Sequence, residues 1–576
     1  MKIKINNKEY KFNEEMTILE ACNQVNIQIP SLCFLKEINE VASCRICVVE
    51  IVGEKRLFPA CSTKIKDNQE ILTNSKKVIN SRKTTLELIL SNHNKNCLSC
   101  PKNGHCELQK LCEIYGVDAS KYEGEKKEYL IQNDNPYLVR DNNKCILCNR
   151  CVSVCEKVQG MEIIKRNYRG FDTEIGSNFN KPLCETSCVY CGQCVNVCPT
   201  GALMERDDTD RVIDALNNPN LHTIVSFAPA VRVSIGEEFG YPLGTSVTGK
   251  LITSLKMLGF NKVFDINYGA DLTVIEEANE LLERLEKNKE LPLITSCCPG
   301  WVNYVTNNYP SLFKNLSTCK SPQQMFGAIC KTYYAKMNNI NPKDIFVVTV
   351  MPCIAKKYEA QTTKNATKYP DVDCVITTRE LAKLIKKNHI DFKNLEPSEI
   401  DNPLGKGNSV IFGTSGGVME TALRYVKEKV EHKKFENLNF KEVRGNKGLK
   451  EATYYIKGRD IKVLVVNGLL NTKEFIEDIL NNKSDYDFIE VMACPGGCIN
   501  GGGQPYVSSY IRNNYDFKKK RSNGLYNIDK NLKSNKAMDN LYIKKMYKEY
   551  LGCPNSDLSK QLLHRNYKKE RLNRNK

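Results

Sequence analysis

The sequence lacks the long apolar segments that mark a membrane-spanning or exported protein. No apolar run in its 576 residues approaches the roughly 18–20 residues that a transmembrane helix needs. The first residues, MKIKINNKEYKF, alternate apolar and polar side chains and contain no apolar core of a signal peptide. A disordered or fibrous chain is excluded, because 41% of the residues are hydrophobic and 26% are charged. The sequence therefore predicts a cytoplasmic, globular protein without a membrane contact.

Phosphate-binding loops are also missing. The Gly-rich segments GTSGG (from residue 413) and GGCINGGG (from residue 496) match neither GxxxxGK(S/T) nor GxGxxG, so this chain is not predicted to bind a nucleotide. The net charge of +17 suggests nucleic acid at first sight, but residues 518–576 alone carry 17 Lys+Arg against 5 Asp+Glu. We therefore predict no nucleic-acid partner. Beyond Arg521 the pattern indicates a peripheral helix followed by a loose, basic tail.

Cysteine is abundant instead. Of the 27 cysteines, 18 lie within the first 200 residues. In a long chain without an export signal, tight cysteine clusters indicate metal ligands rather than disulfides. The length predicts about four domains. Residues 1–77 form a β-rich unit, with strands in KIKINNKEYKF and RLFPACSTKI and a helix in TILEACNQVN that Thr17 caps. Its four spaced cysteines suit a 2Fe–2S cluster, namely Cys33, Cys44, Cys47 and Cys61.

Residues 78–118 contain HNKNCLSCPKNGHC, which predicts a second cluster. Three ligands are clear, namely Cys97, Cys100 and Cys106. On spacing alone, the fourth ligand is left open between His93, His105 and Cys112. A histidine ligand raises the potential of a cluster, because a neutral imidazole replaces a thiolate.

Residues 138–208 hold two C-x2-C-x2-C-x3-C runs, the pattern that builds paired 4Fe–4S clusters. In that arrangement each run takes its fourth ligand from the other run. One cluster is predicted on Cys145, Cys148, Cys151 and Cys198, and the other on Cys188, Cys191, Cys194 and Cys155. Four zinc knuckles are the rival interpretation, but zinc sites favour separate CxxC pairs.

Residues 209–516 alternate strand-like and helical stretches, which is an α/β pattern. The expected strands are HTIVSFAP, NKVFDIN, LPLITS, DIFVVTV, DCVITT, SVIFGTSG, IKVLVVNG and DFIEVMA. Three of them lead directly into cysteines. Because ligands bind at the carboxyl ends of strands in α/β domains, these cysteines are expected to converge on one site. They are Cys297, Cys298, Cys353, Cys494 and Cys498.

Three motifs around these cysteines resemble the signature motifs of FeFe hydrogenases. They read TSCCPGW at 295–301, MPCIAKKYE at 351–359 and EVMACPGGCINGGGQP at 490–505. The order of the upstream modules resembles the long monomeric type of fermentative anaerobes. The resemblance covers essentially the whole chain. It implies a multidomain α+β and α/β protein: a β-grasp ferredoxin module, a small His/Cys3 module, a two-cluster ferredoxin module, a two-lobed catalytic domain (209–516) and a basic helical segment (517–576).

The resemblance also implies the cofactors. The site holds an H-cluster, which is a 4Fe–4S cubane joined through one cysteine to a two-iron centre with CO, cyanide and azadithiolate. The matching cubane ligands are Cys298, Cys353, Cys494 and Cys498, and Cys498 bridges to the two-iron centre. In the second module the family pattern selects His93. One 2Fe–2S and three 4Fe–4S clusters therefore precede the H-cluster.

A proton route follows from the same resemblance. It runs from Arg284 through Glu280, Ser317 and Glu277 to Cys297, whose thiol exchanges protons with the cofactor. Without the resemblance, a solvated helix face is the ordinary interpretation of this charged stripe. Lys356 matches a lysine that bonds a cyanide. For Lys357 the ordinary interpretation, independent of the resemblance, is an ion pair with Glu359. The remaining matches to the cofactor pocket are Pro229, Ala230, Gln323, Met351 and Met492.

The resemblance implies reversible reduction of protons to H2 by a ferredoxin hydrogenase. The expected partners are ferredoxin or flavodoxin as electron carrier and the proteins that install the cofactor, and the chain is expected to be monomeric. Two alternatives stay open at this point. One is the catalytic component of an NAD(P)-linked or electron-bifurcating complex, and the other is an iron–sulfur assembly or electron-transfer protein.

Overall fold

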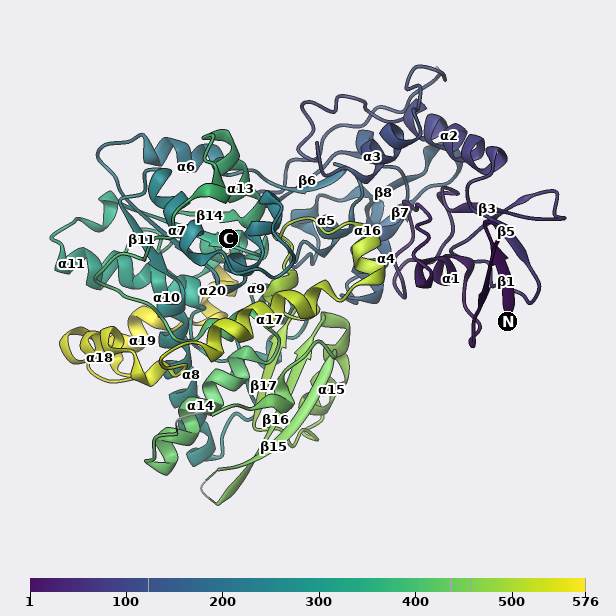
Figure 1. Cartoon of the computed structure of the whole chain (residues 1–576). Coiled ribbons are helices and arrows are strands. Elements are labelled where there is room, and N and C mark those ends of the chain that lie inside the picture. Colours follow the sequence, from purple (N-terminus) through teal and green to yellow (C-terminus); the bar gives the residue numbers. More distant parts are fainter. Residues whose placement is uncertain (123, 436–437, 457, 575–576) are drawn as a thin grey trace. The chain divides into compact units, whose positions relative to one another are not determined.

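The computed structural model describes residues 1–122, 124–435, 438–456 and 458–574 (Figure 1). The chain forms two compact units. Unit 1 contains residues 1–186, 193–206 and 506–516, and unit 2 contains residues 187–192, 207–505 and 517–576. Within the described ranges, no helix combines the length and apolar character that crossing a membrane requires.

Unit 1 begins with a five-stranded sheet in the order β2-β1-β5-β3-β4. Its strands are β1 (Lys2–Ile5), β2 (Lys8–Lys11), β3 (Val48–Ile51), β4 (Leu57–Pro59) and β5 (Glu70–Leu72). The predicted helix forms as α1 (Ile18–Gln24), where Thr17 and Glu20 close a capping box that satisfies free N–H groups of the first turn. The fold class predicted for this module is confirmed.

The rest of unit 1 consists of short elements around the cysteine motifs. The helices are α2 (Lys76–Ser91), α3 (Glu107–Ile114), α4 (Arg150–Lys157), α5 (Gln193–Val197) and α16 (Ser509–Asn514). Two small antiparallel pairs join β6 (Leu138–Arg140) to β9 (Leu203–Glu205) and β7 (Ile164–Asn167) to β8 (Glu174–Ser177).

Unit 2 contains two four-stranded sheets, as the α/β pattern predicts. The first is fully parallel, in the order β11-β10-β13-β14. The second has the order β12-β17-β16-β15, and only β15 runs antiparallel to its neighbour. The strands are β10 (His222–Phe227), β11 (Lys262–Asp265), β12 (Leu293–Ile294), β13 (Ile345–Met351), β14 (Cys374–Thr377), β15 (Leu449–Ile456), β16 (Arg459–Asn467) and β17 (Phe488–Met492).

Helices connect and cover these sheets. They are α6 (Thr209–Leu216), α7 (Thr248–Met257), α8 (Asn267–Lys287), α9 (Pro299–Asn308), α10 (Pro322–Ile329), α11 (Ala335–Met337), α12 (Ala355–Thr362), α13 (Thr378–Lys387), α14 (Gly417–Glu431), α15 (Lys473–Leu480), α17 (Phe517–Lys530), α18 (Leu541–Met546), α19 (Asp557–Leu563) and α20 (Tyr567–Arg574). Helix α8 packs against α10 and α14, and its first fifteen residues are all buried. It is therefore a core helix and not a solvated one.

Two local predictions are wrong. The segment SVIFGTSG forms a 3-10 turn, Val410–Gly413, in place of a strand. The buried Asp271 carboxylate accepts hydrogen bonds from the N–H groups of Asn408 and Ser409, both at 2.9 Å. These N–H groups are therefore not available for pairing with a neighbouring strand.

The C-terminal segment is not a loose tail. It folds into α17 to α20, and Leu525, Met546 and Leu563 have no exposed surface. These apolar side chains are spaced among lysines. The basic composition of the segment therefore gives no indication that one face of its helices is buried. The helical character predicted for it is otherwise as observed.

Candidate metal centre

The five cysteines predicted for this site follow the carboxyl ends of three strands. Cys297 and Cys298 come after β12, Cys353 comes two residues after β13, and Cys494 comes two residues after β17. Cys498 begins a 3-10 turn that follows Gly497. Gly497 has a φ of 96°, and a Cβ there would lie 2.6 Å from the backbone nitrogen of Ser415, so only glycine fits.

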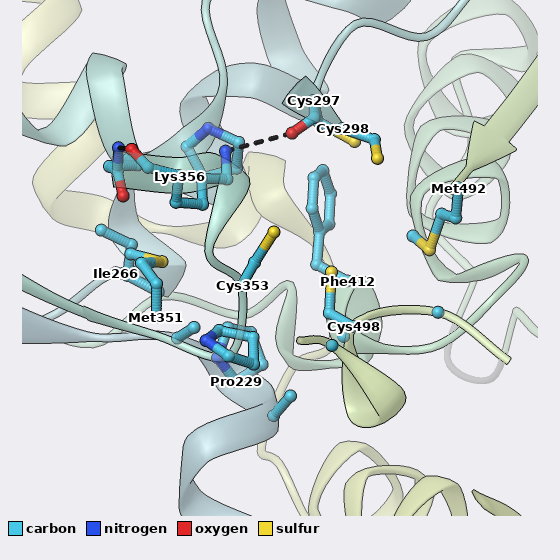
Figure 2. Close-up of a pocket in the computed structure, with 18 of the residues that line it drawn as sticks. Pro229, Ile266, Cys297, Cys298, Met351, Cys353, Lys356, Phe412, Met492 and Cys498 are labelled. Carbon is cyan, nitrogen blue, oxygen red and sulfur yellow. Dashed lines mark hydrogen bonds between the residues drawn. The ribbon is translucent and has the colours of Figure 1, made fainter. Parts of the chain in front are cut away.

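These cysteines line one cavity. In Figure 2 the side chains of Cys353, Phe412 and Cys498 surround the same space. All 27 cysteines are free thiols, so none of the five is held in a disulfide. The structure thus brings together every cysteine that the sequence predicts for this site.

The donor set suits a metal cluster. Burial raises the pKa of Cys498, and a negative charge at Cys298 or Cys353 raises it further, so the thiols lie close enough to repel one another as thiolates. A cationic metal centre removes that repulsion. Cys298 is the N-cap of α9, and its sulfur accepts the N–H of Ala493 at 3.4 Å. Both features favour a thiolate, but burial outweighs them and raises the pKa of the Cys298 thiol in the metal-free protein. The residues present therefore fit a four-cysteine cubane.

Lys356 is the cation of the cavity. Burial opposes its charge, but the Glu359 carboxylate at 2.8 Å raises the pKa of Lys356, so it stays an ammonium. Its Nζ also donates to the carbonyl of Cys297 at 3.1 Å, as the dashed line in Figure 2 shows. The amide of Gln323 donates to the backbone carbonyl of Lys356 at 3.2 Å. A buried ammonium held this way suits an anionic ligand.

The expected pair between Lys357 and Glu359 is wrong. Lys357 Nζ instead lies 2.6 Å from Asp208 and 2.7 Å from Glu380. The two lysines are adjacent on α12 and leave the helix in different directions. Glu359 lies three residues after Lys356, which places it on the face of Lys356. Helical spacing could have indicated this choice.

Apolar side chains form the rest of the wall. Pro229, Ala230, Met351 and Met492 line the cavity, as the resemblance implies. Sequence reasoning missed another set of lining residues, Ile266, Ala270, Pro322, Phe412 and Gly413. Nothing in the sequence distinguished them, because apolar residues at the start of α8, in α10 and in a 3-10 turn have the same pattern as ordinary core residues. A wall of this kind excludes water and strengthens electrostatic interactions inside.

The inner part of the predicted proton route, from Glu277 to Cys297, is buried. Within the described part of the chain, neither carboxylate oxygen of Glu277 makes a hydrogen bond of ordinary length, although the Ser317 hydroxyl and the Ser296 N–H lie near enough to lower its pKa. Burial raises the pKa of Glu277 to about 8, and the nearby Glu280 raises it as well. The Glu277 carboxyl is therefore mostly protonated at neutral pH and available as a donor. Burial and the charge of Glu277 also raise the pKa of Cys297 well above its usual range.

The outer half of the route is joined by direct contacts. Ser317 Oγ donates to Glu280 at 3.1 Å, and Arg284 Nη2 lies 2.6 Å from the same carboxylate. Glu280 and Arg284 are each 8% exposed, so the route ends close to the surface. Sequence reasoning missed Thr318, whose hydroxyl and N–H both donate to Glu280.

Unit 1 also gathers its predicted ligands. In the first module Cys47 and Cys61 have their sulfur atoms 3.4 Å apart, and Cys33 and Cys44 share a hydrogen bond. In the third module Cys145, Cys148, Cys151 and Cys198 line one pocket, which is the crossed pairing that the two cysteine runs predict. For the set Cys155, Cys188, Cys191 and Cys194, which the two units divide, the pairing stays a prediction.

His93 has the features of a ligand in the second module. Its Nδ1 is buried and has no hydrogen-bond partner among the described residues. Burial lowers the pKa of His93 to about 4, so the ring is neutral, as metal binding requires. Cys112, the alternative, lies on α3, where burial raises the pKa of its thiol to about 11.

Replacing His93 by cysteine is expected to lower the reduction potential of the second-module cluster, because an anionic thiolate replaces a neutral imidazole. The potential is measured by redox titration of its electron paramagnetic resonance signal. Cys112→Ala and His105→Ala serve as matched controls and should leave that potential unchanged. A shift in Cys112→Ala without one in His93→Cys would assign the fourth ligand to Cys112.

Five family profiles match the chain in sequence order. They are the 2Fe–2S iron–sulfur cluster binding domain (residues 1–76), the NADH-ubiquinone oxidoreductase-G iron–sulfur binding region (82–121), the ferredoxin-like domain of NADH-quinone oxidoreductase subunit 3 (135–204), the C-terminal domain of the iron only hydrogenase large subunit (221–502) and the iron hydrogenase small subunit (515–570). The profiles cover iron–sulfur modules, a catalytic domain and the C-terminal helices.

Two curated proteins resemble the chain along nearly its full length. Iron hydrogenase 1 of Clostridium pasteurianum is 45% identical over 98% of this chain and 99% of its own length. The NADP-reducing hydrogenase subunit HndD of Solidesulfovibrio fructosivorans is 44% identical over 99% of both chains. A solved variant of FeFe-hydrogenase HydA1 from Chlamydomonas reinhardtii covers 63% of this chain and 99% of its own, with 36% identity and a TM-score of 0.56.

Proposed function

This chain belongs to the FeFe hydrogenase family, and on that premise we propose that it reduces protons to H2 reversibly with electrons from a reduced ferredoxin or flavodoxin. It is an oxidoreductase acting on H2, with a 2Fe–2S domain, further iron–sulfur domains and an H-cluster domain. The observation that carries the proposal is the meeting of four free thiols with Lys356 and Cys297 in one cavity.

The proposed ligands of the cubane are Cys298, Cys353, Cys494 and Cys498. When bound, the H-cluster supplies the centre at which electrons and protons combine. The protein's own residues hold and shield it: Lys356 presents its ammonium to an anionic diatomic ligand, and Met351, Met492 and Phe412 exclude water. Cys297 presents its thiol to the same cavity for proton exchange.

The proposed proton route and the proposed electron route use separate sets of groups to reach the cavity. Protons are proposed to pass along Arg284, Glu280, Ser317, Glu277 and Cys297. Electrons are proposed to enter at the N-terminal iron–sulfur clusters and to pass by the paired 4Fe–4S clusters to the centre. We further propose a cytoplasmic, monomeric enzyme whose two-iron centre is installed by maturation proteins.

One relative favours a second candidate function. At 44% identity, this chain is about as similar to a protein named as an NADP-reducing hydrogenase subunit as it is to iron hydrogenase 1. The sequence has no nucleotide loop of its own, so NADP-linked activity would need a further polypeptide. Purification from native cells together with any bound partners, with H2 formation assayed from reduced ferredoxin and from NADPH, separates the two functions.

Infrared spectroscopy of the anaerobically matured protein tests the assignment of the site. Bands of metal-bound CO and cyanide are expected between the amide and thiol regions, and they should shift under H2. The matched variant Cys353→Ala should lose these bands, whereas Cys330→Ala, a core thiol outside the cavity, should keep them. Full iron content without such bands, in the presence of the maturation proteins, would refute the H-cluster assignment.

A further inference from the structure

A buried polar network joins the proposed proton route to the C-terminal segment. Cys319 and His564 form an isolated antiparallel bridge. On either side of it, the N–H of Lys320 donates to the carbonyl of Leu563 and the N–H of Arg565 donates to the carbonyl of Thr318, both at 2.8 Å. These backbone bonds fix His564 beside Glu280. The proposed route so far makes no use of this histidine.

The side chain of His564 has a partner at each ring nitrogen. Nδ1 lies 2.7 Å from Thr318 Oγ1, and Nε2 lies 3.1 Å from the Glu276 carboxylate. Thr318 Oγ1 lies in turn 3.2 Å from Glu280 Oε2. The ring is 7% exposed, so these contacts compete little with water. A continuous chain of polar atoms therefore runs from Glu276 through His564 and Thr318 to Glu280.

Glu276 fixes which nitrogen of the ring carries a hydrogen. Its carboxylate also accepts hydrogen bonds from the Tyr547 and Ser559 hydroxyls and from the N–H of Asn555. Burial opposes the charge, but His564 and the hydroxyl donors lower the pKa of Glu276, so it is an acceptor only. Nε2 of His564 must then donate to it. The hydrogen that can vary is the one on Nδ1.

The Thr318 hydroxyl has a single hydrogen and therefore has two alternatives. When Nδ1 carries a hydrogen, it donates to the hydroxyl oxygen, and the hydroxyl hydrogen points to Glu280. When Nδ1 is bare, the hydroxyl hydrogen turns to the ring and Glu280 Oε2 loses that donor. The number of donors facing Glu280 thus depends on a residue more than two hundred positions away in the sequence.

The cluster could also be considered as a cation site. The ligand atoms of Glu280, Cys319 and His564 lie within 4.8 Å of one another. Both ring nitrogens already have partners, however, and Glu280 already pairs with the Arg284 guanidinium. A metal ion would break each of these contacts. The geometry therefore favours a hydrogen-bonded network over a metal site.

We propose that His564 and Thr318 form a positioning arm for Glu280, in which the imidazole directs the threonine hydroxyl toward or away from the carboxylate while Glu280 accepts and releases protons. The proposal rests on the proton route proposed above. It gives the C-terminal helices a part in turnover, because they bring His564 and all the groups that orient Glu276 from their own segment.

The first test removes the threonine hydroxyl without changing the shape of the side chain. Thr318→Val is expected to lower kcat for H2 formation about 3- to 10-fold, the effect of one hydrogen bond, with an unchanged KM for the electron donor. Thr318→Ser, which keeps the hydroxyl, should restore kcat. Thr421→Val is the matched control, because the buried hydroxyl of Thr421 bonds only backbone carbonyls of its own helix.

A second test asks whether His564 acts through Thr318. His564→Gln keeps a donor for Glu276 but cannot reach Thr318, so the threonine hydroxyl can no longer turn away from Glu280. Because both variants abolish that change, kcat should fall as in Thr318→Val. The double variant should show no further loss if both residues serve one contact. Additive losses, or a KM that rises while kcat stays the same, would overturn the arm. Iron content and the CO bands must match the parent in every variant.

A spectroscopic readout excludes a merely structural effect. The carboxyl C=O band of Glu280 is identified in infrared difference spectra by its loss in Glu280→Gln. Loss of the hydroxyl donor should shift that band to higher frequency in Thr318→Val and not in Thr421→Val. An unshifted band in Thr318→Val overturns the arm. If Glu280→Gln itself leaves kcat unchanged, the proton route is wrong, which is a separate failure.

Discussion

Replacing Cys297 by serine is expected to lower kcat for H2 formation by about 10²- to 10⁴-fold, the range for removing a proton-transfer group. The thiol lines the cavity, and the carbonyl of the same residue is held by Lys356. A serine hydroxyl has similar size but holds its proton far more firmly than a thiol. Because Cys297 is not a proposed ligand, the iron content should not change. Activity is measured with a reduced artificial donor at saturation.

The control for Cys297 is another buried thiol. Cys330 lies in the core on the C-terminal side of α10 and does not line the cavity. Cys330→Ser makes the same atomic change there and is expected to leave kcat unchanged. Loss of the CO bands in Cys297→Ser would mean that the residue holds the cofactor. Normal kcat with normal bands would remove Cys297 from the proton route.

Replacing Glu277 by glutamine is the second large change. Glutamine has the same shape, but an amide cannot relay a proton as a carboxyl does, so kcat should fall about 10²-fold or more. The KM for the electron donor should not change, because the side chain faces only buried groups. Glu283→Gln on the same helix serves as the control, since Glu283 lies toward the surface and outside the route. Equal kcat in both variants would contradict a role for Glu277.

The same variant should gain stability relative to the parent as the pH rises. Burial raises the pKa of Glu277 from 4.5 to about 8, so the folded chain binds a proton that the unfolded chain has released between these values. The stability of the parent is therefore lost as the pH rises through this window. Glu277→Gln removes that loss, and its Tm should exceed that of the parent at pH 8 but not at pH 4.5. A lower Tm at both values would contradict the raised pKa.

The sequence predicts this site well where its residues are local. Each cysteine follows an apolar strand, so strand ends and spacing are enough to gather them. The sequence is less informative about α8, whose charged stripe reads as a solvated face. Glu280 and Arg284 are buried because the segment 314–319 and His564 of the C-terminal segment lie against them, which no local pattern reveals.

Contacts between distant segments account for the other misses. Thr318 and His564 are in contact although 246 residues separate them in the sequence, and neither belongs to a motif. The apolar positions of the C-terminal segment are diluted by lysines, which made a loose tail the natural expectation. The segment SVIFGTSG has strand-like composition, but the buried carboxylate of Asp271 fixes its backbone instead.

The bridge between Cys319 and His564 has a consequence for biosynthesis. A separation of 246 residues between Thr318 and His564 corresponds to about 12–50 seconds of translation at ~5–20 residues per second. A nascent chain therefore holds every proposed cluster ligand before it holds the segment that covers Glu276 and Glu280. Until that segment is synthesised, Glu276 lacks its partners Tyr547, Ser559 and His564. A chain that stops short of α19 would contain all of its thiols but would lack His564, which contacts Thr318 and Glu276 beside the proposed proton route.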